Sequence, residues 1–287
     1  MTDRQRKRLK YVLVQEIEII ENGRYLTGIK ELLADITRHG IKVISPKEGW
    51  KKPADECILL AATDLFLQKA RERNMAAIAF ENKDYRGEKR TDSPVLLQGF
   101  EEIDYNYIER IWKRKQGIPW EILETERCYL RELELADLDD LYELYAGEGM
   151  TDYIEPLYSR KEEEEYQRAY IQSMYGFYEY GMWLVKEKGT DLLIGRAGLE
   201  HRELNGEPEL ELGYAIAVSY QRQGYALEVC RAILDYAWEN LGYGQVNCLI
   251  EPENTASLGL VKKLGFIYKG RIEQENRCYE RYVIRRA

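Results

Sequence analysis

Short apolar runs alternate with helical patterns over the first 120 residues. The apolar runs predict strands at 10–14, 41–45, 57–62, 76–80 and 95–98. Ile29, Leu32 and Ile36 recur at helical spacing and predict a helix at 27–39. Further helices are expected at 64–73 and 105–115. Because strands alternate with helices, this half is expected to be an α/β fold with a parallel sheet and right-handed crossovers.

The second half has a different order of elements. Gly117-Ile118-Pro119 follows the helix at 105–115 and predicts a linker between domains at 1–118 and 122–287. After the linker, strands are predicted at 128–131, 182–186, 192–199, 209–218, 245–250, 266–269 and 279–284. Helices are predicted at 136–145, 159–175, 227–241 and 254–264. The runs at 182–186 and 192–199 flank a turn and are expected to pair as a hairpin.

A short glycine-containing loop joins the strand at 209–218 to the helix at 227–241. It reads Gln221-Arg222-Gln223-Gly224-Tyr225-Ala226. Free backbone N–H groups and the helix dipole make such a junction suitable for an anion, and Gly224 would let phosphate oxygens approach where a Cβ would obstruct them. Neither the nucleoside-triphosphate loop nor the dinucleotide fingerprint is present. The loop therefore indicates either a pyrophosphate site or an ordinary turn.

Composition narrows the class of protein. The chain of 287 residues is 45% hydrophobic and 32% charged, which is typical of globular domains. It has neither a run of 18 apolar residues nor a secretory signal, so no membrane association is expected and a cytoplasmic location is predicted. Five cysteines without a CxxC pair, and only two histidines, predict free thiols and no metal site.

The charge is unevenly distributed along the chain. Residues 1–120 carry a net charge of +4, whereas residues 121–287 carry −13. The acidic second half disfavours nucleic-acid binding and favours cationic partners such as amines.

The first half resembles the haloacid dehalogenase (HAD) superfamily core in a small form without a cap, over about residues 8–116. Such a domain is a parallel-sheet, three-layer structure. Ser45 matches the family's Ser/Thr at the second strand, Lys51 or Lys52 its lysine, and Thr63-Asp64 its later acidic position.

The HAD nucleophile position departs from the family pattern. Gln15 and Ile17 occupy the positions of the Asp-x-Asp pair, and neither side chain can perform nucleophilic or acid–base chemistry. A shift by one residue would place Glu16 and Glu18 there. Each carboxylate would then lie about one methylene farther from the backbone than that of an aspartate. A catalytically inactive HAD-like domain is therefore predicted, with weak activity or ligand binding as the alternatives.

The second half is similar to the GNAT superfamily of acetyl-CoA-dependent N-acetyltransferases, over about residues 122–286. The residues at 221–226 fit the family's Arg/Gln-x-x-Gly-x-Gly/Ala loop. Asn254-Thr-Ala-Ser257 and Leu264-Gly265-Phe266 fit its later motifs. Residues 124–131 resemble the opening of the branch that acetylates ribosomal-protein N-termini. The family fold is α+β, with a mixed, mainly antiparallel, central sheet.

This resemblance implies a site for acetyl-CoA as co-substrate, and it implies no metal. Backbone N–H groups of the loop would hold the CoA pyrophosphate. The main chain of Ile216 and Val218 would pair with the pantetheine arm, and a bulge in their strand would separate it from the strand at 245–250. Asn254 and Ser257 would contact the pantetheine and phosphate, or simply cap their helix. The loop residues concerned are Gln221, Arg222, Gln223, Gly224, Tyr225 and Ala226.

The reaction needs a base that takes a proton from the amine before it attacks the thioester. Glu211 is the candidate from the strand before the loop, with Glu209 and Glu200 as alternatives. Val261 stands where some relatives carry a tyrosine acid, so a dedicated acid is in doubt. Ten Tyr or Phe residues between 142 and 180 would either line an acceptor pocket or pack in the core.

The sequence thus predicts an acetyltransferase acting on a small amine or a protein N-terminus. A non-catalytic acyl-CoA sensor is the alternative from another class, and an active phosphatase is a third reading. The acceptor, the acyl length, the base, the oligomeric state and the role of the first domain stay open.

Overall fold

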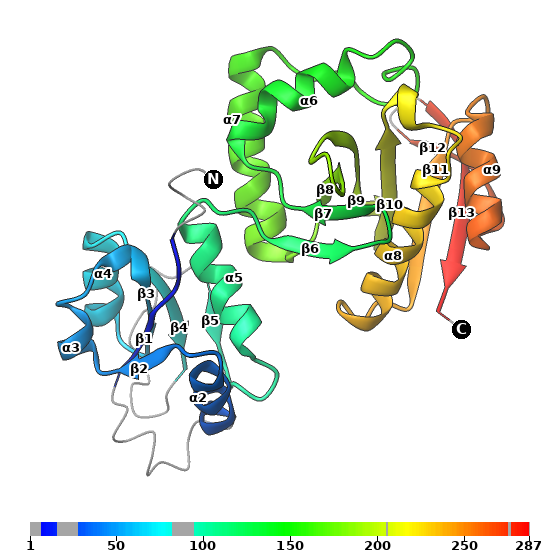
Figure 1. The fold of residues 1–287 in the computed structure, drawn as a ribbon. Coiled ribbons are helices and arrows are strands. Elements are labelled where there is room, and N and C mark those ends of the chain that lie inside the picture. Colours follow the sequence, from blue (N-terminus) through cyan, green and yellow to red (C-terminus); the bar gives the residue numbers. More distant parts are fainter. Residues whose placement is uncertain (1–6, 16–27, 82–94, 205, 275–276, 287) are drawn as a thin grey trace. The chain divides into compact units, whose positions relative to one another are not determined.

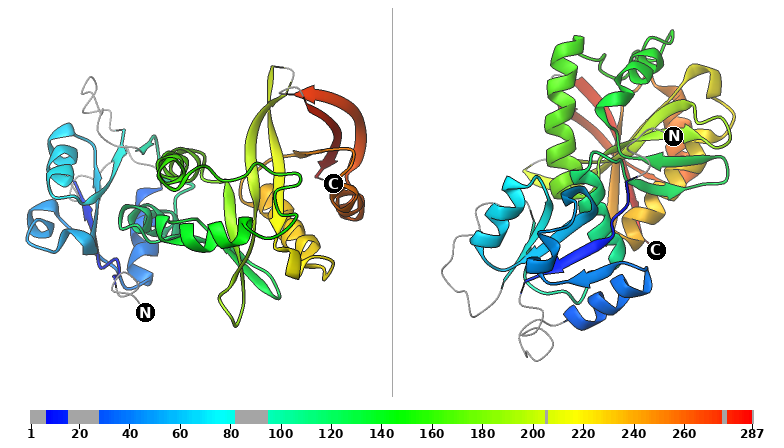
Figure 2. Two further views of the ribbon diagram at one scale, coloured as in Figure 1. Left: turned by 90° about the horizontal axis from the view of Figure 1, so that it is seen from above. Right: turned by 60° about the vertical axis from the view of Figure 1, so that its left-hand side comes forward.

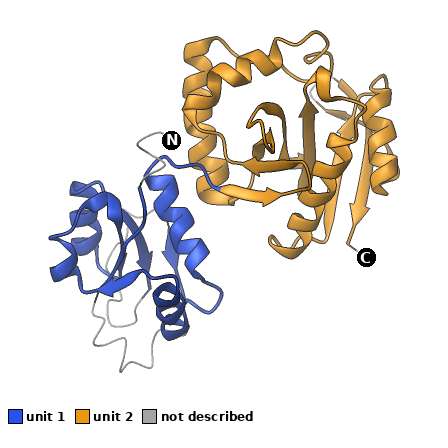
Figure 3. Ribbon diagram, viewed as in Figure 1, with its two compact units in different colours: residues 1–120 blue, residues 121–287 orange. Residues whose placement is uncertain are grey.

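The computed structural model describes residues 7–15, 28–81, 95–204, 206–274 and 277–286. The chain forms two compact units, residues 1–120 and 121–287 (Figure 3). Within the described part, no helix is long and apolar enough to cross a membrane.

Unit 1 contains a five-stranded sheet in the order β2-β1-β3-β4-β5, in which every neighbouring pair is parallel (Figure 1). Its strands are β1 Tyr11–Val14, β2 Lys42–Ile44, β3 Cys57–Ala61, β4 Ala76–Phe80 and β5 Leu96–Leu97. Its helices are α2 Ile29–Arg38, α3 Pro46–Gly49, α4 Asp64–Glu72 and α5 Tyr105–Lys115, with a 3₁₀ turn at Ala54–Glu56. The predicted parallel sheet is confirmed, but the short helix α3 was not predicted.

Helices cover both faces of this sheet. Ile29 and Ile36 of α2 pack with Trp112 of α5 against one face. On the other face, Leu67 of α4 packs against Leu59 and its neighbours. Burial on both faces explains why the strands read as continuous apolar runs rather than alternating patterns.

The residues matched to the HAD pattern lie near the carboxyl ends of β1, β2 and β3. Gln15 is 3% exposed, and its Oε1 accepts hydrogen bonds from the backbone N–H groups of Ala62 and Thr63 and from the Thr63 hydroxyl. Ser45 caps α3, whereas Asp64 is the first residue of α4. Ile17, Glu16 and Glu18 lie outside the described residues.

We expect Gln15→Ala to destabilise unit 1 by about 2–4 kcal/mol, because buried donors of Thr63 lose their acceptor. Hydrogen exchange of β1 and β3 amides in the full chain would measure this loss. Gln68→Ala is the matched control, since Gln68 is exposed and bonds only Glu72 across one helix turn. Equal exchange in the two variants would contradict the prediction.

Unit 2 contains an eight-stranded sheet in the order β12-β13-β11-β10-β9-β8-β7-β6. Its strands are β6 Glu121–Glu124, β7 Cys128–Arg131, β8 Met182–Glu187, β9 Leu193–Leu204, β10 Glu207–Ile216, β11 Gln245–Ile250, β12 Ile267–Gln274 and β13 Arg277–Arg285. Neighbours are antiparallel except β10 and β11, which are parallel. The sheet is therefore mixed and mainly antiparallel, as predicted.

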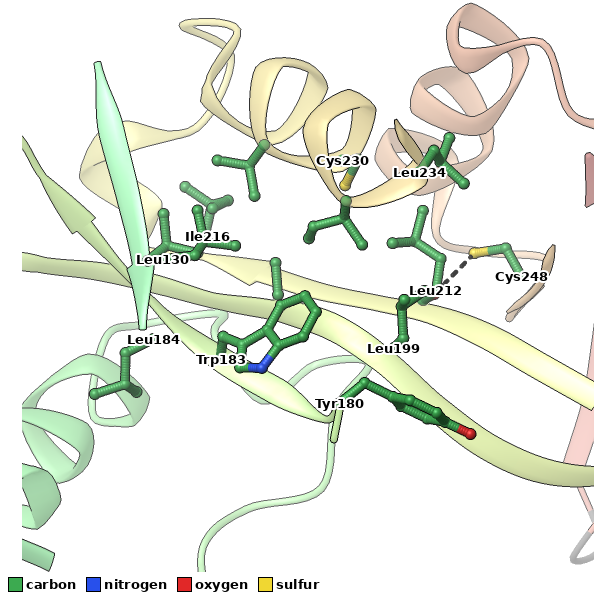
Figure 4. Close-up of a cluster of buried hydrophobic side chains, with 14 of the residues drawn as sticks. Leu130, Tyr180, Trp183, Leu184, Leu199, Leu212, Ile216, Cys230, Leu234 and Cys248 are labelled. Carbon is green, nitrogen blue, oxygen red and sulfur yellow. Dashed lines mark hydrogen bonds between the residues drawn. The ribbon is translucent and has the colours of Figure 1, made fainter. Parts of the chain in front are cut away.

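Helices α6 Leu138–Tyr145, α7 Arg160–Tyr170, α8 Tyr225–Glu239 and α9 Thr255–Leu264 complete unit 2 (Figure 2). Leu199 of β9 and Leu212 of β10 are a cross-strand pair, and Figure 4 shows them on the side of the sheet where Cys230 and Leu234 of α8 lie. The side chains that alternate with these along the two strands point to the other face of the sheet, on the side of α7. Glu200 of β9 is one of them, and its carboxylate accepts a hydrogen bond from the Tyr170 hydroxyl.

Several elements of unit 2 differ from the prediction: β9 and β12 extend further, to Leu204 and Gln274, and three other differences lie near the linker, α7 and the loop. The predicted helix at 159–175 ends as α-helix at Tyr170 and continues as a π-helix, Ile171–Tyr178. Strand β6 was not predicted, because its residues were assigned to the linker and domain start. Strand β10 ends at Ile216, so Val218 lies in a following 3₁₀ turn, Val218–Tyr220, rather than in the strand.

Candidate active site

Strands β10 and β11 separate beside the loop at 221–226 of unit 2. The parallel pair is registered at one position only, Glu211 opposite Asn247. In contrast, β9 and β10 pair continuously from Glu207–Leu204 to Ile216–Gly195 without a register shift. The expected bulge is therefore absent from the β9–β10 pairing, although the expected separation of β10 from β11 is present. Main-chain groups of β10 beyond Glu211 are left without pairing to β11.

The loop between β10 and α8 holds two residues in the left-handed region. Arg222 has φ 61° and Gly224 has φ 88°. Successive turns of this kind point neighbouring N–H groups into one concavity that can receive an anion. Within the described ranges, the backbone N–H groups of Arg222, Gln223 and Gly224 have no acceptor. The loop thus presents unpaired donors at the N-terminus of a 15-residue helix.

Side chains of the loop bond within the protein rather than outward. The Gln221 Nε2 donates to the Ile216 carbonyl at 2.9 Å, and the Gln223 Nε2 donates to the Ser219 carbonyl at 2.7 Å. Tyr225 is buried and its hydroxyl donates to Glu187. The Arg222 side chain is exposed. The glutamines and the tyrosine therefore shape the loop, and the backbone is left to bind an anion.

Gly224 has a different neighbour from the one expected. A Cβ at this position would lie 3.4 Å from Nη2 of Arg127. The left-handed backbone at Gly224 is the feature that favours glycine here, and its role in admitting phosphate oxygens stays a prediction.

Asn254 and Ser257 lie at the start of α9. The Asn254 side chain caps this helix by accepting from the Ser257 N–H at 3.1 Å. The Ser257 carbonyl accepts from the Tyr214 hydroxyl at 3.5 Å. Tyr214 comes from β10, so a side chain that the sequence did not single out connects β10 to α9. The capping role for Asn254 is present, and a ligand role stays a prediction.

The three candidate carboxylates lie on one face of β9 and β10. Glu211 is directly opposite Glu200 in the strand pairing. Glu209 is held by an ion pair with Arg281 at 2.7 Å and by the side-chain amides of Gln245 and Asn247. Because its oxygens already accept these bonds, Glu209 is the least suited of the three to take a proton from a substrate.

Burial sets the ionisation of Glu211. Its side chain is 12% exposed and forms an ion pair with Arg202. Burial, aided by the nearby Glu200 carboxylate, raises the pKa of Glu211 to about 7, although Arg202 opposes the shift. A carboxylate with a pKa near neutral pH is suited to general base catalysis.

The aromatic residues divide into a core group and an exposed group. Tyr170, Tyr175 and Tyr180 are buried, and the Tyr170 hydroxyl accepts from the Met182 N–H. The exposed group lies in the segment before α7, on α7 and on the π-helix, and consists of Tyr153, Tyr158, Tyr166, Phe177 and Tyr178. Tyr166 makes an edge-to-face contact with Tyr158 and a tilted contact with Tyr170, and the Tyr170 hydroxyl donates to Glu200 at 3.4 Å. Core packing is therefore confirmed for the buried group, and a role of the exposed group in an acceptor pocket stays a prediction.

Four side chains around this site were missed by sequence reasoning. They are Arg127, Arg202, Tyr214 and Arg281. Only Arg127 lay within a motif that the sequence singled out. No group of three or more His, Cys, Asp or Glu side chains that could hold a metal is found among the described residues.

Comparison with known proteins identifies the class of unit 2. Residues 127–267 match the family described as the acetyltransferase (GNAT) domain. Unit 2 therefore contains a GNAT acetyltransferase domain, the type of domain found in N-acetyltransferases.

Two relatives and one solved structure are similar to this chain. The chain is 29% identical over 163 residues to YkkB of Bacillus subtilis (strain 168), covering 55% of this chain and 94% of YkkB. It is 28% identical over 158 residues to the N-acetyltransferase YoaA of the same organism, covering 53% and 86%. The fold is similar to that of RimL, a ribosomal L7/L12 alpha-N-protein acetyltransferase in complex with coenzyme A. That match has a TM-score of 0.51 and 15% identity, and it covers 58% of this chain and 98% of RimL.

Proposed function

We propose that unit 2 binds acetyl-CoA and transfers its acetyl group to a primary amine. The observation that carries the proposal is the combination of unpaired loop N–H groups with the separation of β10 from β11. The N–H groups of residues 222–226 would hold the pyrophosphate, and main-chain groups of β10 that do not pair with β11 would pair with the pantetheine arm near Ile216. Val218 and Ser257 would line the phosphate side, and Asn254 the pantetheine.

In the proposed reaction, the amine gives a proton to Glu211, directly or through water. The neutral nitrogen then forms a bond to the thioester carbonyl carbon, the carbon–sulfur bond breaks, and the nitrogen releases its second proton to solvent to give the amide. The CoA sulfur leaves as a thiolate and takes up a proton from solvent, since Val261 is buried in the core where some relatives have a tyrosine. Glu200 lies opposite Glu211 and adds negative charge that attracts an ammonium group.

The acceptor is either a small amine or a protein N-terminus. Unit 2 is acidic, and exposed Tyr158 and Tyr166 lie near Glu200, which favours a cationic acceptor. The alternative that the acceptor is a protein N-terminus is supported by the motif at 124–131 and by the similar fold of RimL, an alpha-N-protein acetyltransferase.

Binding and turnover of the full chain test the proposal separately. Calorimetric titration with CoA measures binding, and CoA release in the presence of an amine panel measures transfer. The panel contains polyamines, amino sugars, amino acids and peptides with free N-termini. Binding with no turnover of any amine would favour an acyl-CoA sensor, and absence of CoA binding would refute the proposal.

For unit 1 we propose a HAD-like module without phosphatase activity. The support is that Gln15, at the position of the nucleophile, uses its carboxamide oxygen to accept three internal hydrogen bonds. An amide oxygen engaged in this way cannot form an acyl-phosphate. Magnesium-dependent hydrolysis of an aryl phosphate by the full chain would contradict this proposal.

A further inference from the structure

The turn between β6 and β7 carries an arginine that bonds the start of α8. The backbone N–H of Arg127 donates to Glu228 Oε1 at 2.8 Å, and its Nε donates to Glu228 Oε2 at 2.7 Å. Glu228 lies in the first turn of α8. One carboxylate therefore receives both the main chain and the side chain of the same residue, which fixes the turn against the helix.

The same guanidinium reaches into the glycine loop. Its centre lies 3.9 Å from the centre of the Tyr225 ring, and its Nη1 donates to the Gln223 carbonyl at 3.0 Å. Stacking and the two N–H directions fix the plane of the Arg127 group as well as its position. Gln223 is 96 residues away in the sequence, so this contact is a tertiary one.

The bond to the Gln223 carbonyl determines the direction of the next N–H group. The described chain has no cis peptide bonds, so the Gln223–Gly224 peptide is trans. In a trans peptide the C=O and N–H point in opposite directions. Because the carbonyl points to Arg127, the Gly224 N–H points away from Arg127, and it has no acceptor among the described residues.

A second group holds the two ends of the loop. The Glu187 carboxylate, at the end of β8, accepts from the Tyr225 hydroxyl at 2.9 Å and from the Tyr220 hydroxyl at 3.4 Å. Thr190 also donates to Glu187. With both ends attached to Glu187, the central Gln223–Gly224 peptide is the part whose orientation depends on Arg127.

We propose that Arg127 is a positioning residue for the phosphate-binding loop, which turns the Gly224 N–H toward the pyrophosphate of CoA. The inference rests on the proposed acetyl-CoA function. It also gives the Thr125-Glu126-Arg127 segment a physical role, because Thr125 orders the same turn by bonding Cys128. Preorganised donors bind more tightly because their ordering is not required on binding.

The test compares ligands with and without the pyrophosphate. We expect Arg127→Ala to raise the Kd for CoA by about 10- to 100-fold, the size expected for lost hydrogen bonds to a charged group. The Kd for pantetheine, which has the same thiol arm and no pyrophosphate, is expected to stay unchanged. With the best amine of the panel, KM for acetyl-CoA should rise in the same proportion while kcat stays near the wild-type value.

Two further variants make the test specific. Arg127→Lys keeps the charge but lacks the forked donors, so it is expected to weaken CoA as Arg127→Ala does. Arg271→Ala removes an exposed arginine that pairs with Glu280 and should leave both Kd values unchanged. Circular dichroism melting of each full-length variant shows whether it is folded, and Arg127→Lys carries the test if Arg127→Ala is not.

Three results would overturn the positioning role. They are an unchanged Kd for CoA, an equal rise for CoA and pantetheine, and full rescue by Arg127→Lys, which would show that charge alone matters. Wild-type protein that binds no CoA would instead refute the proposed function, so the two failures are distinguished by the wild-type titration.

Discussion

Glu211→Gln is expected to lower kcat by about 10²- to 10⁴-fold, the usual range for loss of a general base. The amide keeps the size of the side chain but cannot take a proton from the amine. KM for acetyl-CoA should change little, because Glu211 lies on β10 before the loop and contributes no group to phosphate binding. Steady-state kinetics at saturating acetyl-CoA, with the best amine of the panel, measure the loss.

The pH profile gives a second readout for the same residue. A base with a pKa of about 7 is ionised only above neutral pH, so kcat/KM should fall as pH drops through 7. In Glu211→Gln this limb should be absent. Glu280→Gln is the matched control, since Glu280 is another strand carboxylate paired with an arginine, and it should keep the wild-type profile.

The raised pKa of Glu211 also affects the stability of the fold. Its folded-state pKa exceeds its unfolded value, so the folded state holds the proton more tightly between about pH 4.5 and 7. Stability is therefore lost as pH rises through this window. Glu211→Gln should melt at a higher temperature than wild type at pH 8 and lose this advantage at pH 4.5.

An activity of Glu211→Gln within threefold of wild type would contradict its role as the base and would assign that role to Glu200.

Local sequence patterns were sufficient for features that depend on neighbouring residues. The loop at 221–226 and the helix start at Asn254 are such features, because a glycine with positive φ and a side-chain cap are set within a few residues. The parallel sheet of unit 1 followed from the alternation of strands and helices. These local signals located the loop but gave no information about what holds it.

Features that depend on distant residues were not predictable. Arg127 meets Gln223 and Glu228 only because the β6–β7 turn lies beside α8 in the folded chain. The pKa of Glu211 depends on which residues face it across the strand pair, and that register places Glu200 opposite. The π-helix after α7 was missed because its residues keep a helical apolar pattern, while the hydrogen-bond spacing is set by packing.

Gly224→Val is expected to raise the Kd for CoA by about 100-fold, through two effects at one position. A β-branched residue is strained at φ 88°, by about 1–2 kcal/mol. Its Cβ would also lie 3.4 Å from Nη2 of Arg127, and its methyl groups would push the guanidinium from the Gln223 carbonyl. The Gly224 N–H would then lose its fixed direction toward the ligand.

Gly242→Val is the control for backbone strain outside the loop. Gly242 has φ 71°, and a Cβ there would meet nothing within 4 Å. The control variant therefore carries the same kind of backbone strain, without displacing Arg127 and away from the loop. Both variants should melt at lower temperature, but only Gly224→Val should weaken CoA binding in calorimetric titration. If Gly224→Val bound CoA as tightly as Gly242→Val, the prediction would be wrong, and CoA binding would depend neither on the backbone at Gly224 nor on its contact with Arg127.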